Sequence, residues 1–268
     1  MAETNQVVGQ KTMGKVRTLI LRVPGTNCDV ETAFAFEQAG AEVTTVHVNR
    51  LIRGEQRLAD YQIMVVPGGF TYGDDISAGK VLANELRLKL GEDIGRFVED
   101  GGLILGICNG FQALIKAGIL PELANEGPPR LTVAANDSGR FECRWVHLRV
   151  NRESPCIFTR GIDRMELPVA HGEGKVVADP KVLPELNVVL YYTDENGNNK
   201  AGYPHNPNGS VANIAGICDA SGRIFALMPH PERHIQGTQH PQWTRRVLKE
   251  HGDGFQIFLN AVAWAQGL

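Results

Sequence analysis

Residues 103–112 constrain the fold of this chain more than any other stretch. They read Leu-Ile-Leu-Gly-Ile-Cys-Asn-Gly-Phe-Gln, which predicts a buried strand that ends in a sharp turn and leads directly into a helix. Gly106 and Gly110 leave no Cβ atoms at the points where the strand and the helix would collide. Glycines on both sides of Cys108 form the pattern of a nucleophile elbow, with a thiol as the candidate nucleophile. The alternative is an ordinary buried cysteine, which packs as a small apolar residue.

An elbow of this kind would also assemble groups that stabilise negative charge. The helix after Cys108 would direct its N-terminal N–H groups at the sulfur, which favours the thiolate. The backbone N–H of Asn109 would then be free to face an oxyanion. We expect a second oxyanion donor within residues 67–70, Pro-Gly-Gly-Phe, because a strand ends there and glycine lets a backbone N–H approach a ligand closely. The alternative for this second segment is a plain turn between a strand and a loop.

Strands and helices alternate in the first half of the chain. The expected strands cover residues 17–23, 42–48, 61–66 and 103–107, and the expected helices cover residues 28–39, 77–90 and 92–100, with a further helix that ends near 118. This alternation predicts an α/β fold with a parallel, doubly wound sheet, whose carboxyl-terminal edge holds the site. After residue 121 the pattern becomes strand-rich, with expected strands at 131–133, 141–150, 175–177, 188–192, 214–217 and 223–227 and a final helix at 254–264. We expect this half to add antiparallel strands.

Composition and charge exclude several classes of function. The chain of 268 residues carries 27 basic and 30 acidic residues, which are well mixed and give a net charge of −3. No basic stripe indicates nucleic acid or an anionic membrane, and no apolar run approaches the roughly 20 residues that span a bilayer. Five cysteines without a spacing rule favour a reducing cytoplasm over a disulfide framework. Residues 1–15 are polar, and we expect them to be a flexible lead-in to a single domain at residues 16–268.

A base and an orienting group for the thiol are expected in residues 228–232, Met-Pro-His-Pro-Glu, directly after a strand. In an extended segment, side chains two residues apart point to the same side, so His230 and Glu232 would face one way. The proline between them stiffens the backbone. The Glu232 carboxylate can accept a hydrogen bond from one imidazole nitrogen and leave the other for Cys108, which is the logic of a catalytic triad. The alternative is a proline-rich surface loop.

A metal site is a competing interpretation of the same segment. His230 and His234 are four residues apart and would face one metal on a helix, but Pro229 and Pro231 disfavour a helix through His230. No cysteine pair or carboxylate completes a set at the usual zinc spacing, so we expect no metal. Cys28 follows the first strand and could approach the site, but the sequence favours a core or structural position for it.

Seven motifs carry a resemblance to a known family, and they follow one another in family order along nearly the whole chain after Lys15. They are residues 24–29 (Pro-Gly-Thr-Asn-Cys-Asp), 67–74 (Pro-Gly-Gly-Phe-Thr-Tyr-Gly-Asp), 106–112 (Gly-Ile-Cys-Asn-Gly-Phe-Gln), 136–142 (Asn-Asp-Ser-Gly-Arg-Phe-Glu), 170–175 (Ala-His-Gly-Glu-Gly-Lys), 203–210 (Tyr-Pro-His-Asn-Pro-Asn-Gly-Ser) and 228–233 (Met-Pro-His-Pro-Glu-Arg). With them the sequence resembles the class I, triad-type glutamine amidotransferases, and among these the members that serve purine biosynthesis. The resemblance implies a flavodoxin-like mixed sheet with added antiparallel strands.

The resemblance implies a glutaminase that works through a cysteine thioester. Cys108 attacks the side-chain amide of L-glutamine and releases ammonia. His230 protonates the leaving amine and then activates water, while Glu232 orients His230. For the second oxyanion donor, the resemblance implies Gly69 or Phe70.

The resemblance also assigns the substrate pocket. Gln112, one helical turn past the candidate nucleophile, would touch glutamine. His171, Gly172, Glu173 and Gly174 would line the pocket and contact the amino-acid end of glutamine through the backbone.

Partners, rather than a cofactor in this chain, follow from the same resemblance. The ammonia would pass to a large synthetase subunit, in a complex with a small bridging subunit. The synthetase would use ATP and Mg to turn formylglycinamide ribonucleotide into the amidine. The glycine-rich residues 172–175 lack the spacing of a nucleotide-binding loop, which agrees with ATP being bound elsewhere.

Two other functions stay open at this point. One is a cysteine hydrolase of similar fold, such as a peptidase or deglycase relative, although these lack the His-Pro-Glu sequence after the late strand. The other is a binding or regulatory domain without catalysis. Such domains usually lack the Cys, the His or the Glu, and all three are present here.

Overall fold

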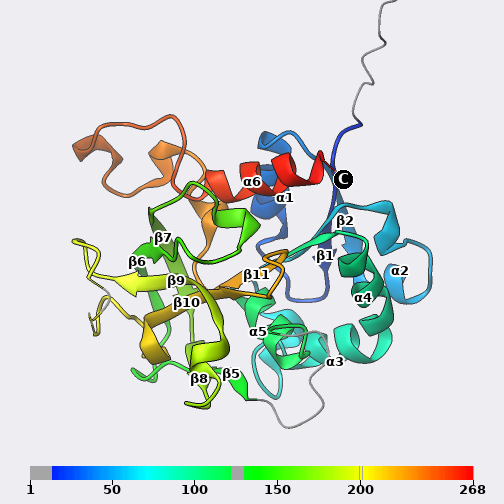
Figure 1. Cartoon of the computed structure of the whole chain (residues 1–268), viewed down its shortest axis with the longest axis horizontal. Coiled ribbons are helices and arrows are strands. Elements are labelled where there is room, and N and C mark those ends of the chain that lie inside the picture. The colour runs from blue at the N-terminus through cyan, green and yellow to red at the C-terminus, as the bar shows by residue number, and fades with distance from the viewer. Residues whose placement is uncertain (1–13, 122–129, 199, 201, 268) are drawn as a thin grey trace, which may run out of the picture.

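A mixed sheet runs through the centre of the computed structural model, which describes residues 14–121, 130–198, 200 and 202–267 (Figure 1). Within these residues, the sheet has nine strands in the order β2 (Glu42–His47), β1 (Arg17–Arg22), β3 (Ile63–Val66), β4 (Leu103–Ile107), β11 (Ile224–Leu227), β10 (Ile214–Cys218), β9 (Asn187–Thr193), β6 (Glu142–Val150) and β7 (Arg164–His171). The first five of this order are parallel, and the last four are antiparallel to their neighbours. A small antiparallel sheet pairs β5 (Leu131–Ala135) with β8 (Glu173–Ala178).

This topology confirms the α/β class with a doubly wound parallel half and added antiparallel strands in the C-terminal half. The order 2-1-3-4 of the first strands is that of flavodoxin-like sheets. Residues 1–13 of the expected lead-in lie outside the described residues.

Helices cover both faces of the sheet. α1 (Asp29–Gln38) and α6 (Phe255–Ala265) lie together on one face, where the rings of Phe36 and Phe258 meet edge-to-face with centroids 5.0 Å apart (Figure 1). α3 (Lys80–Lys89) and α5 (Asn109–Lys116) pack against each other on the opposite face. The remaining helices are α2 (Val48–Ile52) and α4 (Gly91–Glu99). The site at the carboxyl ends of the parallel strands is thus held between two layers of helix.

The structure departs from the sequence-based expectation at three elements. β7 is not predicted by the sequence, because it contains Pro168 and proline cannot donate to a sheet ladder. β7 forms the edge of the sheet, where proline is tolerated. α2 begins at Val48, where the sequence predicts the end of a strand, and α3 begins only at Lys80, because Ile76 and Gly79 have positive φ angles of 73° and 71°.

The elbow between β4 and α5 depends on two glycines. α5 passes so close to β3 that a Cβ on Gly110 would lie 1.9 Å from the carbonyl oxygen of Val66. A Cβ on Gly106 would lie 2.5 Å from Cδ1 of Leu114. Because the first of these contacts is with backbone, a side chain at Gly110 would force β3 and α5 apart.

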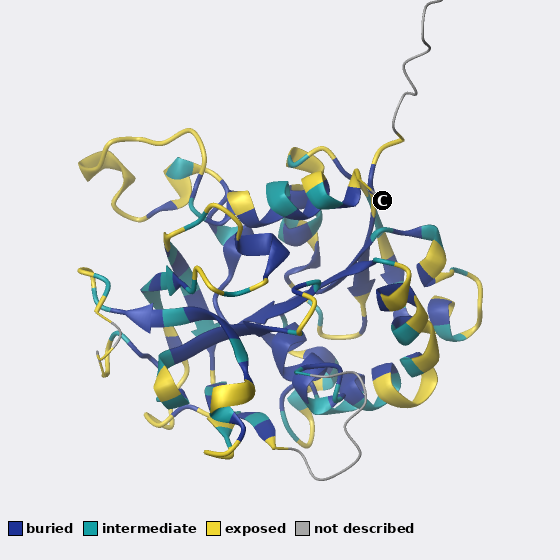
Figure 2. Cartoon of the chain, in the orientation of Figure 1, coloured by how far each residue is buried: buried dark blue, intermediate teal, exposed yellow. Residues whose placement is uncertain are grey.

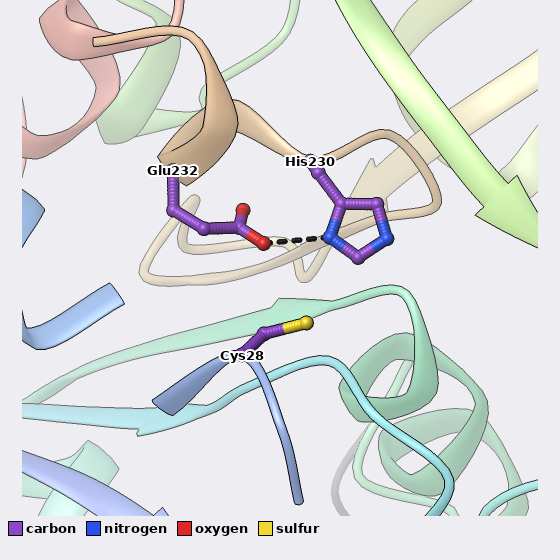
Figure 3. Close-up of side chains that lie close together, drawn as sticks. All are labelled: Cys28, His230 and Glu232. Carbon is purple, nitrogen blue, oxygen red and sulfur yellow. Dashed lines mark hydrogen bonds and ion pairs between the residues drawn. The ribbon is translucent and has the colours of Figure 1, made fainter. Parts of the chain in front are cut away.

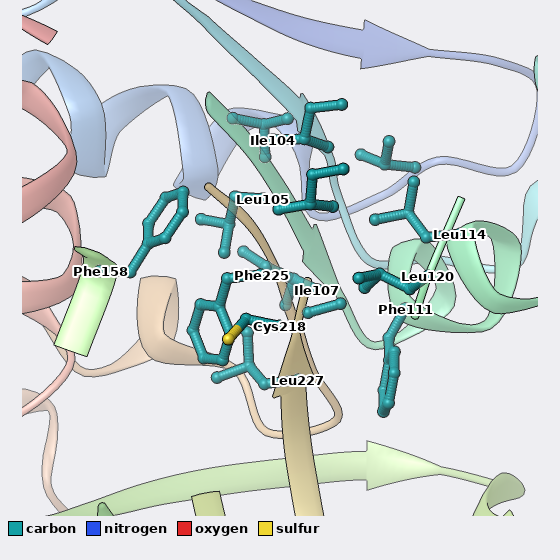
Figure 4. Close-up of a cluster of buried hydrophobic side chains, with 14 of the residues drawn as sticks. Ile104, Leu105, Ile107, Phe111, Leu114, Leu120, Phe158, Cys218, Phe225 and Leu227 are labelled. Carbon is teal, nitrogen blue, oxygen red and sulfur yellow. The ribbon is translucent and has the colours of Figure 1, made fainter. Parts of the chain in front are cut away.

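Buried apolar side chains surround the elbow and make it rigid. All five residues of β4 are buried, and Figure 2 shows that the central strands are buried along their length. Figure 4 shows Ile107 of β4 packed near Phe225 and Leu227 of β11, with Phe111 on the α5 side. These four side chains have no exposed surface. Each of them contributes about 1.5–3 kcal/mol by burial, so the strand ends that carry the site are firmly held.

We predict that Gly110→Ala destabilises the fold by about 1–3 kcal/mol or more, because the new methyl group overlaps the Val66 carbonyl. Helix propensity alone predicts the opposite effect, an increase of up to about 1 kcal/mol in the free energy of unfolding. The measurement is the free energy of unfolding in urea. Gly95→Ala in α4 is the matched control, because a Cβ at Gly95 meets nothing within 4 Å, and it should stabilise the protein. A stabilising effect of both substitutions would contradict the proposed packing of the elbow.

Candidate active site

Cys108 lies at the turn between β4 and α5, and its backbone is strained. Its φ is 50° and its ψ is −103°, a conformation that residues with a side chain rarely adopt. Its N–H donates to the carbonyl of Leu227 on the adjacent strand at 2.8 Å, and its Sγ lies 3.7 Å from the carbonyl oxygen of Ala170. The thiol is therefore held at the carboxyl end of β4, where a nucleophile elbow presents its side chain.

His230 and Glu232 form a buried pair on the loop after β11. Nδ1 of the imidazole and Oε1 of the carboxylate lie 2.6 Å apart, and the two residues are only 2% and 1% exposed. The sequence predicts an extended segment here, but Pro231–Arg233 forms a 3-10 turn, and the two side chains still meet (Figure 3). β11 is parallel to β4 and adjacent to it, so the carboxyl ends of these strands bring His230 to Cys108.

The surroundings of His230 favour its protonated form. Burial lowers the pKa of the imidazole, but the Glu232 carboxylate and Cys108 outweigh burial and raise the pKa well above its ordinary value. Nδ1 faces Glu232, whereas Nε2 is buried and has no hydrogen-bond partner among the described residues. A proton from the thiol can therefore be held at Nε2, where the carboxylate stabilises the resulting imidazolium.

The three residues expected to bind an oxyanion differ in how free their backbone N–H groups are. Gly69 has a φ of 150°, and a Cβ there would lie 2.7 Å from the carbonyl oxygen of Gly25. The N–H of Phe70 already donates to that same oxygen at 2.9 Å, so it would have to break this hydrogen bond to bind an oxyanion. Asn109 is the first residue of α5, where backbone N–H groups have no partner within the helix. Phe70 is therefore the weakest candidate of the three.

The side chain of Asn109 ties the elbow to the loop after β3. Its Oδ1 accepts hydrogen bonds from the backbone N–H and the hydroxyl of Thr71, at 3.2 and 2.7 Å. Its Nδ2 donates to Oδ1 of Asp74 at 3.0 Å and to Oε1 of Gln112 at 2.9 Å. Because Asn109 is buried, each of these bonds would be costly to lose. The loop that contains Gly69 is thus fixed relative to the elbow.

Gln112 and the segment between β7 and β8 form one connected wall beside the elbow. Nε2 of Gln112 donates to the carbonyl of Glu173. Oδ1 of Asn136 accepts from the N–H of Gly174 at 3.0 Å and lies 3.1 Å from Nδ1 of His171. A Cβ on Gly174 would lie 2.4 Å from the His171 ring, so only glycine fits there. The predicted substrate residues are therefore brought together. Asn136, which begins the motif at residues 136–142 but is assigned no role from the sequence, supports them.

Glu173 uses its side chain to support the fold. The carboxylate accepts from the N–H of Ala78 at 3.3 Å and pairs with Lys116 at 3.4 Å. Nζ of Lys116 also donates to the carbonyl of Ala78 at 2.6 Å. On the other side of this segment, the carbonyl of Gly172 accepts from the N–H of Asn136 at 3.0 Å. The segment is therefore held from two sides, and several of its backbone groups bind within the protein.

Cys28 and Arg233 lie at the site, although the sequence favours a core or structural position for Cys28. Sγ of Cys28 accepts a hydrogen bond from Nη2 of Arg233 at 3.0 Å. A Cβ on Gly68 would lie 3.0 Å from this sulfur and 2.9 Å from Cε1 of His230, so the thiol and the ring are neighbours. The order of the elements along the chain was the one indication of this position. Cys28 follows β1, whose carboxyl end lies on the same edge of the sheet as those of β3 and β4.

One group in the described part of the chain could hold a metal ion. It consists of Cys28, His230 and Glu232, whose ligand atoms lie within 4.8 Å of one another. It differs from the His230 and His234 pair considered from the sequence, because Nδ1 of His234 instead donates to the carbonyl of Glu166 at 2.7 Å. Across the same described ranges, no helix combines the length and the apolar character needed to cross a bilayer.

The fold and the site together define a class of protein, an α/β enzyme with a Cys-His-Glu arrangement at the carboxyl edge of a mixed sheet. The CobB/CobQ-like glutamine amidotransferase domain matches residues 15–265. The phosphoribosylformylglycinamidine synthase subunit PurQ of Dehalococcoides mccartyi is 62% identical over 254 residues, which cover 95% of this chain and 99% of that protein. The subunit PurQ of Methanococcus maripaludis is 43% identical over 264 residues, with 92% and 97% covered. The chain therefore belongs to the glutamine amidotransferase family, in the branch that these PurQ subunits form.

Solved structures agree with this assignment. A chain of PurLQS from Thermotoga maritima matches with a TM-score of 0.71 and 33% identity, over 93% of this chain and 98% of that chain. A second glutamine amidotransferase from Thermotoga maritima matches with a TM-score of 0.51 and 18% identity, over 87% of this chain and 82% of that chain, which supports the fold alone. The mixed sheet with added antiparallel strands is thus a fold of glutamine amidotransferases.

We predict that His171 makes the protein sensitive to acid. Burial, and then the charge of His230, lower the pKa of His171 to about 4, whereas the unfolded chain takes up this proton near the ordinary value of 6.5. As pH falls from 6.5 to about 4, protonation favours the unfolded state, and up to about 3 kcal/mol of stability is lost. His171→Asn should lack this loss.

The test compares the free energy of unfolding of the wild type and His171→Asn across this pH range. The difference between them should shrink as the solution becomes more acidic. His251→Asn at an exposed position is the matched control. A pH-independent difference for His171→Asn would mean that His171 accepts a proton in the folded protein as easily as in the unfolded chain.

Proposed function

We propose that this chain hydrolyses L-glutamine to glutamate and ammonia and supplies the ammonia to a synthetase that makes formylglycinamidine ribonucleotide. The observation that carries the proposal is the buried His230–Glu232 pair, which is aimed at a thiol on a strained elbow. The branch of the family to which the chain belongs supports the particular synthetase, because its relatives are phosphoribosylformylglycinamidine synthase subunits.

The proposed reaction divides amide hydrolysis into two steps. The Cys108 thiolate attacks the amide carbon of glutamine, and the proton held by His230 passes to the leaving nitrogen, so that ammonia departs and a thioester remains. His230 then takes a proton from water, the hydroxide attacks the thioester, and the same proton returns to the sulfur as glutamate leaves. Glu232 keeps His230 in the required orientation and stabilises its charge in both steps.

The negative charge on the carbonyl oxygen is stabilised by backbone donors in this proposal. Gly69 and Asn109 are the donors that we favour, with Phe70 contributing only if its bond to Gly25 opens. An oxyanion donor is worth roughly 3–4 kcal/mol of barrier when it is already in place. Asn109 can hold the N–H groups of Gly69 and Asn109 at a fixed separation, because its side chain binds the loop after β3 while its backbone begins α5.

Substrate contacts are proposed for the wall beside the elbow. Gln112 and the residues His171, Gly172, Glu173 and Gly174 would meet the amino-acid end of glutamine, largely through backbone groups. The side chains of Gln112 and Glu173 are already hydrogen-bonded within the protein, which favours a role in holding the wall. The chemistry of this site needs a thiol, an imidazole, a carboxylate and water, so we assign ATP and Mg to the partner.

The proposed partners are a large synthetase subunit and a small bridging subunit. PurLQS of Thermotoga maritima, by its name an assembly, contains a chain similar to this one, which supports a complex of this kind. We also place the protein in a reducing compartment such as the cytoplasm, because its five cysteines are all free thiols and one of them is the proposed nucleophile.

We predict that Cys108→Ala abolishes glutamine-dependent synthesis by the complex, by at least about 10³-fold, while free ammonium still supports synthesis. The substitution removes the nucleophile but leaves the synthetase site untouched. The measurement is the rate of amidine formation with each nitrogen source. Cys143→Ala at an exposed cysteine is the matched control and should retain both activities. Glutamine use that survives Cys108→Ala would rule out the thioester mechanism.

Labelling with an electrophilic diazo-ketone analogue of glutamine identifies the nucleophile and its pocket in one experiment. Mass spectrometry should find one adduct, on Cys108, and glutamine should suppress it. An adduct on another cysteine, or one that glutamine does not suppress, would favour a cysteine hydrolase with a different substrate. If no adduct forms even when the synthetase is present, a binding domain without catalysis is the better interpretation.

We predict that Glu232→Gln lowers both the pKa of His230 and the rate of glutamine hydrolysis. The carboxylate raises this pKa, so an uncharged amide at the same place should let burial dominate. The rate should fall by about 10²–10⁴-fold. The pKa can be followed through the imidazole Cε1–H resonance. Glu92→Gln on the exposed side of α4 is the matched control, and it should leave the titration of His230 unchanged.

A further inference from the structure

A second thiol adjoins the proposed triad, and the mechanism does not use it. Cys28 comes from the start of α1, about two hundred residues before His230 and Glu232 in the chain. Figure 3 shows its sulfur pointing toward the hydrogen bond between the imidazole and the carboxylate. The ligand atoms of the three residues lie within 4.8 Å of one another, and all three residues are buried. The fold thus gathers a thiol, an imidazole and a carboxylate at one point.

Two atoms of this cluster have no hydrogen-bond partner among the described residues. They are Nε2 of His230 and Oε2 of Glu232, both in side chains that are almost fully buried. Nε2 is the nitrogen that the proposed mechanism uses with Cys108, so a cation in this cluster would bind Nδ1, the nitrogen beside Glu232. The unpartnered Oε2 leaves the buried carboxylate with an unsatisfied acceptor, which favours a cation beside it. The donor types are those that Zn²⁺ prefers, since thiolate, imidazole and carboxylate are its usual ligands in proteins.

We propose that Cys28, His230 and Glu232 form an inhibitory binding site for a thiophilic divalent cation, of which Zn²⁺ is the type. The inhibition rests on the proposed glutaminase function, whereas the binding does not. The site takes three protein ligands and leaves a fourth position for water, which is the composition of an open zinc centre.

The distances in the cluster fit such a cation after small movements. Zinc bonds of about 2.0–2.3 Å in a tetrahedral arrangement place neighbouring donors roughly 3.5 Å apart. Nδ1 of His230 and Oε1 of Glu232 lie 2.6 Å apart and would have to separate, while the Cys28 sulfur would have to approach. Both changes are rotations of side chains, and neither moves the sheet.

Arg233 is the group that opposes binding, because its guanidinium lies 3.0 Å from the Cys28 sulfur. Its side chain is 35% exposed and also pairs with Glu31 at 3.3 Å, so it can withdraw toward solvent and keep a carboxylate partner. A metal–thiolate bond then replaces two hydrogen bonds at the sulfur, the one from Arg233 and the one that the thiol donates to Oδ1 of Asn27 at 3.1 Å.

Occupation of the site stops the proton transfers of the proposed mechanism. The thiol of Cys28 loses its proton to solvent on binding, and the proton between Nδ1 and Glu232 leaves as the cation takes its place. Nε2 then keeps its own proton, because a metallated imidazole has no second position for it. His230 can no longer accept a proton from Cys108 or from water, so neither step of the reaction proceeds.

The binding test uses the full chain with Cys108→Ala, which removes the nucleophile as a ligand and makes the outcome independent of glutamine hydrolysis. Co²⁺ serves as the spectroscopic probe for Zn²⁺. We expect one equivalent to bind, with a thiolate-to-cobalt charge-transfer band that Zn²⁺ displaces. The band should vanish when Cys28→Ser is added and persist when Cys143→Ser is added instead. Absence of the band, or a band that survives Cys28→Ser, would overturn the site.

The inhibition test titrates the assembled complex with Zn²⁺ and follows glutamine hydrolysis. Cys28→Ser should raise the concentration that gives half-inhibition by at least about tenfold relative to the wild type, whereas Cys143→Ser should not. An unchanged half-inhibition concentration for Cys28→Ser would overturn the proposal. If cobalt binds as expected but the complex has no glutaminase activity at all, the metal site stands and the proposed function fails.

Discussion

The close contact between α5 and β3 is the constraint on which the site depends. With no side chain at Gly110, the helix can lie against the backbone of Val66, and the turn before it is forced into the strained conformation of Cys108. Strain of this kind costs about 1–3 kcal/mol, and it persists only where the surroundings fix the backbone. Here the buried β4 strand and the hydrogen bond to Leu227 supply that support. The thiol is thus placed mainly by the packing of the backbone that carries it, with one hydrogen bond from Sγ to the carbonyl of Ala170.

The pairing of β4 with β11 completes the site from the other half of the chain. These strands are adjacent and parallel, although more than a hundred residues separate them. Their carboxyl ends therefore deliver Cys108 and His230 to the same point, and Glu232 follows on a short turn. The same register leaves β10 and the strands beyond it to run antiparallel, so β7 ends at His171 beside the wall formed by Gln112. One strand pairing therefore sets both the chemical groups and the proposed substrate wall.

Local pattern was enough to predict the four N-terminal strands of the parallel sheet and the residues now proposed as the triad. It did not show that β11, from the half expected to add antiparallel strands, pairs in parallel with β4. The elbow at Cys108 and the His-Pro-Glu sequence each combine residue type with spacing, so they can be read without a structure. β7 could not be predicted, because Pro168 is unfavourable in any strand except one at an edge, and edges are decided by the whole sheet. The position of Cys28 at the site could not be predicted either, because its neighbours belong to distant segments, the loop after β3 and the loop after β11.

The electrostatics of the site explain why a second thiol, Cys28, beside His230 and Glu232 favours cation binding. A glutaminase of this type needs a buried imidazole whose charge a carboxylate stabilises, and burial makes that interaction strong. The same burial leaves Nε2 of His230 and Oε2 of Glu232 without a hydrogen-bond partner in the part of the chain that the structure describes. Arg233 places one positive charge next to Cys28, and a metal ion could supply a larger one at the same point. The features that equip the imidazole for catalysis are therefore the ones that attract a competing cation.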